Sequence, residues 1–151
     1  MKTIIIFLCL FIGHFQELNA QNNQIWSHKI FDYTITFNFE KEQFKVDTID
    51  SYEGYVFYFK FVSDSSYFRM NYISPNAKFE CCTNDTIYKV LNKKINGKII
   101  DTNGKIGMSN LRWRVIKNED IEIVYNNCSE RMLNLFNEIM NSVYKKFTCK
   151  Y

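Results

Sequence analysis

Alternating apolar and polar positions run through the first half of the chain. In the segment 33–39 (YTITFNF) every second residue is apolar, which is the period-two pattern of a half-buried strand. Similar patterns predict short strands over 44–49 and 67–73. The segment 54–62 (GYVFYFKFV) is apolar on both faces, which is typical of a central strand covered on each side. Together these segments predict a sheet built from successive hairpins.

A change of period marks the middle of the chain. Between Asn84 and Asn96 the apolar residues stand at helical spacing, Asn84 can cap the start, and Asn96-Gly97 can close the end. This pattern predicts a short middle helix, although Asn-Gly is equally a hairpin turn. The apolar residues concerned are Ile87, Val90, Leu91 and Ile95.

Three further strands are predicted after this segment, over 98–102, 105–117 and 120–126. The pairs Asn103-Gly104 and Asn118-Glu119 provide the turns between them. Such short connections indicate that the three strands pair in an antiparallel manner.

The chain ends in its clearest helix. Asn127, with Glu130 three positions later, resembles a capping box at the start of this helix. Asn137 and Asn141 point away from the apolar stripe, so we expect alanine at either position to change the stability by less than ~0.5 kcal/mol. The stripe follows the spacing i, i+3, i+4, i+7 and consists of Met132, Leu135, Phe136, Ile139, Met140, Val143 and Phe147.

The predicted fold class is α+β. A helix with one apolar stripe must pack on another surface, and the face of the antiparallel sheet is the available partner. We expect a sheet of about six to eight strands, with the C-terminal helix packed on one face and a short middle helix. No repeat, linker or low-complexity block divides the chain, which predicts a single globular domain over 21–151.

The N-terminal segment predicts export. Met1-Lys2-Thr3 is a short positive start, residues 4–13 (IIIFLCLFIG) are apolar throughout, and Ala20 offers a small residue at the cut point. Ten apolar residues span only ~15 Å as a helix, so a membrane anchor is not expected. We therefore expect a secretory signal peptide over 1–20, cleaved after Ala20. The mature protein is predicted to be secreted or periplasmic, without membrane insertion.

Charge narrows the range of partners. The net charge is only +3, and the basic residues are scattered along the chain. The groupings Lys93-Lys94 and Lys145-Lys146 are too small for the basic footprint that nucleic acids require. A nucleic-acid partner is therefore not predicted.

The order of elements resembles the PsbP-like group of small exported domains. Aromatic strands, a middle helix, a late hairpin over 111–125 and a C-terminal helix follow one another, and 135–143 (LFNEIMNSV) is similar to the end of such domains. The similarity covers most of the mature chain at the level of element order. It implies an adaptor or assembly role rather than an enzyme, with no shared catalytic residues to carry over.

Cysteines Cys81, Cys82, Cys128 and Cys149 remain after removal of the signal. An even count in an exported protein predicts disulfides, and the favoured arrangement has bridges from Cys81 or Cys82 to the ends of the last helix. A helix of ~19 residues would hold Cys128 and Cys149 ~28 Å apart, which excludes a bond between these two unless the helix breaks. The alternative is a thiol-redox protein that uses Cys81-Cys82 or Cys128, because a helix N-terminus would lower the pKa of a free Cys128 thiol.

Catalytic groups are sparse in this sequence. His28 is the only histidine outside the signal and adjoins Ser27, but adjacency in sequence is not the geometry of a nucleophile and its base. We expect His28 to be a surface residue in a flexible start of the chain. Glu119, Asp120 and Glu122 surround a turn and are interpreted as solvated turn residues. No enzyme, no cofactor and no metal site are predicted.

The aromatic strands carry the remaining candidate site. In 54–62 and 67–73 one face mixes tyrosine with lysine, arginine and asparagine, which is the composition of a recognition surface, and Arg112-Trp113-Arg114 extends it. We predict an exported, non-enzymatic domain that binds a protein partner or a small ligand through this aromatic and basic sheet face. The candidate binding residues are Tyr58, Arg69, Arg112 and Trp113.

Overall fold

The structure, a computed structural model, describes residues 25–149 except 31–32, 41, 52–53 and 74–86. This part of the chain forms nine strands and one helix. Their bounds are β1 (Ile25–Ile30), β2 (Tyr33–Asn38), β3 (Phe44–Ser51), β4 (Gly54–Phe61), β5 (Tyr67–Ile73), β6 (Tyr88–Asn96), β7 (Ile99–Ile106), β8 (Arg112–Lys117), β9 (Ile121–Cys128) and α1 (Glu130–Thr148).

Seven of these strands form one antiparallel sheet in the order β3-β4-β5-β9-β8-β7-β6. It consists of two meanders, β3–β4–β5 and β6–β7–β8–β9, which join where β9 pairs with β5. The strands β1 and β2 form a separate antiparallel hairpin. The α+β class and the antiparallel sheet are thus confirmed, and the predicted strands 44–49, 54–62 and 67–73 correspond to β3, β4 and β5.

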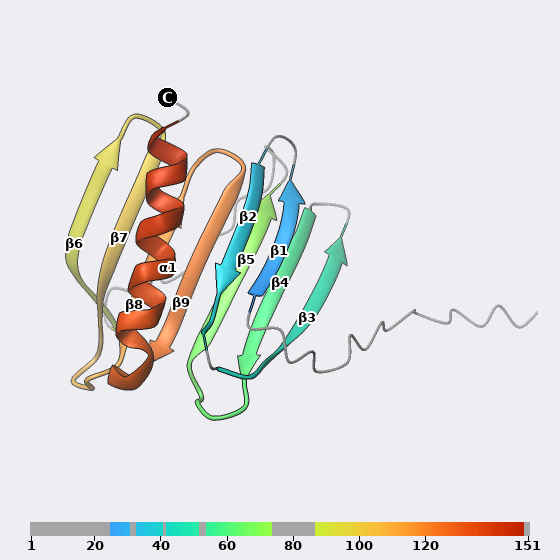
Figure 1. The fold of residues 1–151 in the computed structure, drawn as a ribbon. Helices are drawn as coiled ribbons and strands as arrows, with labels where there is room; N and C mark the ends of the chain where they lie inside the picture. Colours follow the sequence, from blue (N-terminus) through green and yellow to red (C-terminus); the bar gives the residue numbers. More distant parts are fainter. Residues whose placement is uncertain (1–24, 31–32, 41, 52–53, 74–86, 150–151) are drawn as a thin grey trace, which may run out of the picture.

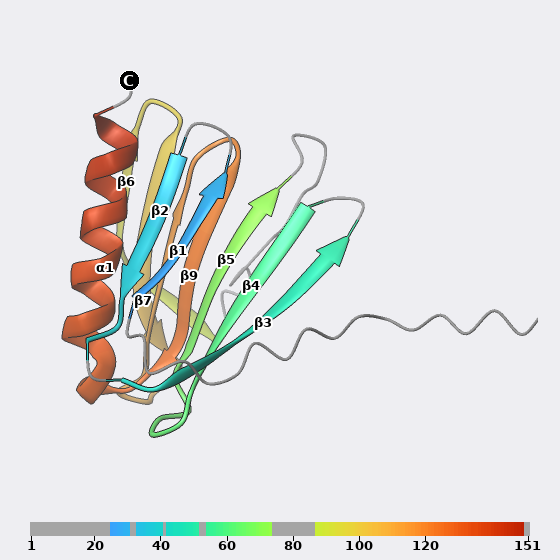
Figure 2. The same cartoon turned by 45° about the vertical axis from the view of Figure 1, so that its right-hand side comes forward.

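Two covers lie side by side on one face of the sheet (Figures 1 and 2). The helix α1 packs on β7, β8 and β9, and it also contacts β2. The β1–β2 hairpin lies over β4 and β5. We call α1 the helix cover and β1–β2 the hairpin cover. The predicted packing of the C-terminal helix on one sheet face is confirmed.

The hairpin cover packs through aromatic rings. The Trp26 ring centroid lies 5.0 Å from those of both Phe57 and Phe59 on β4. Phe37 lies 5.4 Å from Phe59 and 5.1 Å from Phe68, in edge-to-face contacts. Such pairs add to the hydrophobic gain from burying the rings. β1 itself was not predicted: the segment expected to be a flexible start is a strand paired with β2.

The helix cover packs through the predicted stripe. Phe136 is fully buried, with its ring centroid 5.2 Å from Phe61, 5.2 Å from Phe68 and 5.7 Å from Tyr125. Leu135, placed in the stripe, is only partly buried. The buried residues of the helix are Met132, Phe136, Ile139, Met140, Val143 and Phe147.

The predicted capping box at Asn127 is wrong. Ser129 caps α1, and its hydroxyl accepts a hydrogen bond from the backbone N–H of Met132 at 3.4 Å. Asn127 belongs to β9 and adopts a left-handed φ of 50°, a conformation that asparagine tolerates better than most residues. The pairing of β9 with β8 continues to Cys128, the residue before the cap.

A buried polar network joins α1 to the sheet. Arg114 on β8 is 8% exposed and donates two hydrogen bonds to the carboxylate of Asp101, at 2.9 and 2.8 Å. The same guanidinium donates to Asn137 at 3.2 Å and to Asn141 at 2.8 Å. The Tyr125 hydroxyl also donates to Asn137, at 2.9 Å. Although Asn137 and Asn141 lie outside the apolar stripe, both accept hydrogen bonds from a buried cation, so the physical basis for expecting alanine to be neutral at these positions does not hold.

The predicted middle helix is also wrong. Residues 88–96 form the edge strand β6, which ends at Asn96 and connects to β7 through a turn at Gly97-Lys98, with Gly97 at a φ of 56°. The hairpin signal of Asn-Gly thus prevails over the helical spacing. Pairing with β7 also places the Tyr88 ring 5.9 Å from that of Trp113.

The turn that leads into β8 differs from the prediction. Asn103-Gly104 lies inside β7, and the chain reverses around Gly107, which has a φ of 53°. Gly104 is needed for close packing, because a Cβ there would lie 2.8 Å from Trp113 Nε1. The Trp113 indole donates to the carbonyl of Lys105 at 3.2 Å. The predicted strand 105–117 is therefore the end of β7, a turn and β8.

Candidate functional site

The side of the seven-stranded sheet that points away from both covers is called the second face. No helix or strand in the described part of the chain lies on it. Tyr58 on β4 and Arg69 on β5 are direct cross-strand partners there. The ring of Tyr67 lies 5.6 Å from that of Tyr58. Strand pairing thus brings two tyrosines and an arginine together from separate segments.

A buried carboxylate holds the arginine of this group. Glu122 on β9 is 1% exposed, and its Oε1 accepts hydrogen bonds from Arg69 Nη2 at 3.1 Å and from Asn71 Nδ2 at 2.9 Å. Burial raises the pKa of the Glu122 carboxyl, while Arg69 and the neighbouring Lys117 lower it in part. The interpretation of Glu122 as a solvated turn residue is therefore wrong. Its burial follows from the pairing of β9 with β5, which no local pattern in the sequence shows.

The Tyr67 hydroxyl stays protonated at neutral pH. Burial raises the pKa of Tyr67 to about 12, and Tyr58 contributes to the increase while Arg69 opposes it. A protonated phenol can both donate and accept a hydrogen bond. We call Tyr58, Tyr67, Arg69, Asn71 and Glu122 the Tyr–Arg cluster.

The other two predicted binding residues lie elsewhere. Trp113 is 2% exposed and packs on the second face with Val115 and Val124, of which Val124 is the cross-strand partner of Arg69. Arg112 precedes Trp113 and points to the side of the helix cover, where its charge acts on Tyr125. The structure therefore brings together Tyr58 and Arg69 of the four candidates, and it adds Tyr67, Asn71 and Glu122.

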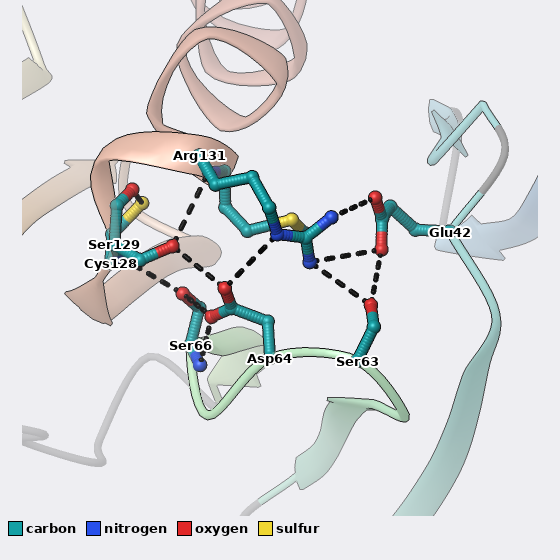
Figure 3. A network of polar contacts seen from close by, with 8 residues as sticks. Glu42, Ser63, Asp64, Ser66, Cys128, Ser129 and Arg131 are labelled. Atoms are coloured by element: carbon teal, nitrogen blue, oxygen red, sulfur yellow. Dashed lines mark hydrogen bonds and ion pairs between the residues drawn. The ribbon is translucent and has the colours of Figure 1, made fainter.

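A second polar group lies at the N-terminal end of α1, where the β4–β5 turn and the loop before β3 meet the start of the helix (Figure 3). Asp64, in the turn between β4 and β5, accepts hydrogen bonds from the Ser66 N–H and the Ser129 hydroxyl, each at 2.7 Å, and one from the Ser66 hydroxyl. Burial raises the pKa of Asp64, but these hydrogen bonds outweigh it and leave the pKa below its usual value. The Asp64 carboxylate thus ties the β4–β5 turn to the cap of the helix.

Arg131 extends this group to the loop before β3. Its guanidinium donates to the two carboxylate oxygens of Glu42 at 2.6 and 3.2 Å, and to the Ser63 hydroxyl at 3.0 Å (Figure 3). Hydrogen bonds from Arg131 and Ser63 lower the pKa of Glu42. His28 stacks on Trp26 and lies tilted against Phe57 in the hairpin cover, and it takes no part in this group. The polar group around Asp64 and Arg131 thus connects the β4–β5 turn and the loop before β3 to the helix. It lacks the serine–histidine pairing of a hydrolase.

The cysteines of the described residues are free thiols. Cys128 is buried, and burial together with the nearby Asp64 raises its pKa to about 12. The expectation of a lowered Cys128 pKa is wrong, because desolvation outweighs the effect of the helix N-terminus. Cys149 is exposed at the other end of α1. Cys81 and Cys82 lie outside the described residues.

Among residues that the structure describes, no three His, Cys, Asp or Glu side chains form a group that could hold a metal ion. Within that same part, no helix has the length and apolar character to cross a membrane. Comparison with family models, with curated proteins and with solved structures found no match to this chain.

Proposed function

We propose that this chain is an exported, non-enzymatic domain that binds a protein partner through the Tyr–Arg cluster. The observation that carries the proposal is the pairing of Tyr58 with Arg69 on a sheet face that no described helix or strand covers. Tyrosine and arginine are enriched among residues that dominate binding energy at protein interfaces. Of the PsbP-like order of elements, the aromatic strands, the late hairpin and the C-terminal helix remain, while β6 replaces the middle helix. The predicted signal peptide is in keeping with a secreted or periplasmic location.

The cluster is also ordered before any partner arrives. Arg69 is held by Glu122, whose second hydrogen bond comes from Asn71. The Arg69 side chain keeps 16% of its surface exposed. A side chain that is already fixed loses less conformational entropy on binding, which increases the net affinity. A protein interface is therefore favoured, because the guanidinium of Arg69 is already oriented and the rings of Tyr58 and Tyr67 provide contact area.

The test is cross-linked recovery of partners from the native exported fraction, quantified by mass spectrometry, with two variants of the cluster. Tyr58→Ala removes the partly exposed ring, and Arg69→Lys keeps the charge beside Glu122 but loses the planar group. We expect each variant to reduce recovery of the same partner by about tenfold or more. Asn134→Ala, on the exposed side of α1, is the control and should leave recovery unchanged. Equal recovery with all three variants and the parent would exclude this surface.

The alternative function, thiol-redox activity, depends on cysteines that differ in accessibility. Alkylation of the folded protein, followed by peptide mass spectrometry, should label Cys149 at once and Cys128 only after unfolding. The same experiment reports whether Cys81 and Cys82 are bridged. Rapid labelling of Cys128 in the native protein would contradict its burial and favour the redox function.

A further inference from the structure

We propose that the outer edge of β6 accepts an extended acidic segment of a protein partner as an additional strand. β6 is the last strand of the sheet and pairs on one side with β7, and no described strand pairs with its other side. A free edge presents unpaired backbone N–H and C=O groups. Addition of a strand to such an edge is a recurrent mode of peptide recognition.

The apolar side chains at this edge have no place in the described cores. Only Tyr88 is held, by its ring contact with Trp113. The others are the residues whose spacing imitates a helical stripe, of which Ile87 directly precedes β6, and each is at least 47% exposed. Their exposed fractions are 47% for Ile87, 50% for Val90, 47% for Leu91 and 65% for Ile95. An added strand would bury part of this apolar area, which favours association.

The charges at the edge specify the partner. β6 has the sequence YKVLNKKIN, which contains three exposed lysines and no acidic residue. Opposite charges on neighbouring strands stabilise a sheet and like charges destabilise it. A second copy of the chain would bring the same three lysines, Lys89, Lys93 and Lys94, to this edge and would add positive charge to positive charge. An acidic segment is therefore the complementary occupant.

The same features limit the choice of partner. Lysines and bulges on an edge strand hinder uncontrolled pairing, and β6 carries a bulge between Val90 and Asn92. The lysines repel a basic strand, whereas they attract an acidic segment. In the strand order of the sheet, β6 is separated by β9, β8 and β7 from β4 and β5, which carry Tyr58 and Arg69. It is thus a separate interaction surface, independent of the Tyr–Arg cluster.

The experiment uses the purified chain and a blocked peptide of alternating Glu and Val, as long as β6. Fluorescence anisotropy gives the affinity, and amide hydrogen exchange shows which strand is protected. We expect binding with slower exchange in β6, and no binding of a peptide of alternating Lys and Val. The double variant Lys93→Glu, Lys94→Glu should bind about tenfold more weakly, because two attractive pairs become repulsive. The matched control is Lys145→Glu, Lys146→Glu, which changes the net charge equally on exposed residues of α1.

Backbone pairing is tested separately from charge. The Glu–Val peptide with N-methyl groups on alternate residues cannot complete a ladder and should not bind. Equal binding of the N-methylated peptide, or equal weakening by the two double variants, would overturn the proposal in favour of general charge attraction. Protection of another strand would place the peptide elsewhere and overturn the proposal as well. So would self-association of the chain through β6, or binding of anionic vesicles without binding of the peptide, because each gives the β6 edge a different occupant.

Discussion

The two covers of the sheet bury the same face by different chemistry. The hairpin cover packs through rings, with Trp26 and Phe37 against aromatic side chains of β4 and β5. The helix cover also has an apolar stripe, but beneath it Arg114 donates hydrogen bonds to Asn137 and Asn141. Packing of rings depends on shape and area, whereas hydrogen bonds from a charged group fix distance and direction.

The difference indicates what sets the position of each cover. Asn137 and Asn141 are one helical turn apart, and both accept from the guanidinium of Arg114. Sliding the helix along the sheet would break these two hydrogen bonds and leave a buried cation with fewer partners. The hairpin cover is positioned by the volumes of its rings. Burial thus stabilises both covers, and among the described residues the polar contacts with the sheet that fix a register are those of the helix cover.

The largest effect is expected at the centre of the helix cover. Phe136→Ala empties a fully buried site between Phe61, Phe68 and Tyr125 and should lower the free energy of unfolding by about 3–5 kcal/mol. Against a total of about 5–15 kcal/mol, this loss can unfold the domain. Chemical denaturation measures it, with Asn134→Ala as a control expected to stay within about 0.5 kcal/mol of the parent. A Phe136→Ala variant as stable as the parent would mean that α1 is not docked on the sheet.

A smaller effect tests the polar contacts of the helix cover. Asn137→Ala leaves the Tyr125 hydroxyl and one N–H of Arg114 without their acceptor, and we expect a loss of about 1–3 kcal/mol. Asn141 is exposed, so water can replace it and Asn141→Ala should cost less. Denaturation of both variants beside Asn134→Ala compares three asparagines of one helix. If Asn137→Ala and Asn134→Ala have the same stability, the polar network does not hold the helix.

The apolar part of the helix cover could be predicted from sequence, and its polar part could not. A stripe at helical spacing reports burial within one segment, so Phe136 and Ile139 were identified correctly. The acceptor role of Asn137 depends on Arg114, which lies 23 positions earlier and on another element. In the same way, Glu122 becomes the partner of Arg69 only through the pairing of β9 with β5. Contacts of this kind follow from strand order, which local patterns do not contain.

The error at β6 has a different physical origin. Periodicity indicates secondary structure because buried residues must share a face. The apolar residues of β6 are exposed, so their spacing carries no information about a buried face. The turn residue Gly97 and the pairing with β7 decide the conformation instead. The helical spacing therefore gave a wrong prediction at the strand edge that we propose as an interaction surface.

The two covers should also depend on each other through Phe68, which contacts both Phe37 and Phe136. In a double-mutant cycle, Phe37→Leu and Phe136→Leu should deviate from additivity by at least about 0.5 kcal/mol. The reference cycle pairs Phe136→Leu with Ile49→Ala, an exposed residue of β3, and should be additive within about 0.3–0.5 kcal/mol. Full additivity in the first cycle would show that the covers are energetically independent.

The smallest expected effect is a pH dependence confined to the hairpin cover. His28 lies against Trp26 and Phe57, with ring centroids 5.7 and 4.6 Å away, and burial lowers its pKa below 6.5. The unfolded chain therefore takes up a proton at His28 more readily than the folded one. The contribution of His28 to stability is complete above pH 6.5 and declines as the pH falls from 6.5 through the lower pKa of the folded state.

The variant His28→Phe keeps an aromatic ring in place but cannot be protonated. Denaturation at pH values on either side of this window should show a stability loss on acidification that is smaller in His28→Phe than in the parent. Identical pH profiles of the two proteins would place His28 in water and contradict its stacking in the hairpin cover.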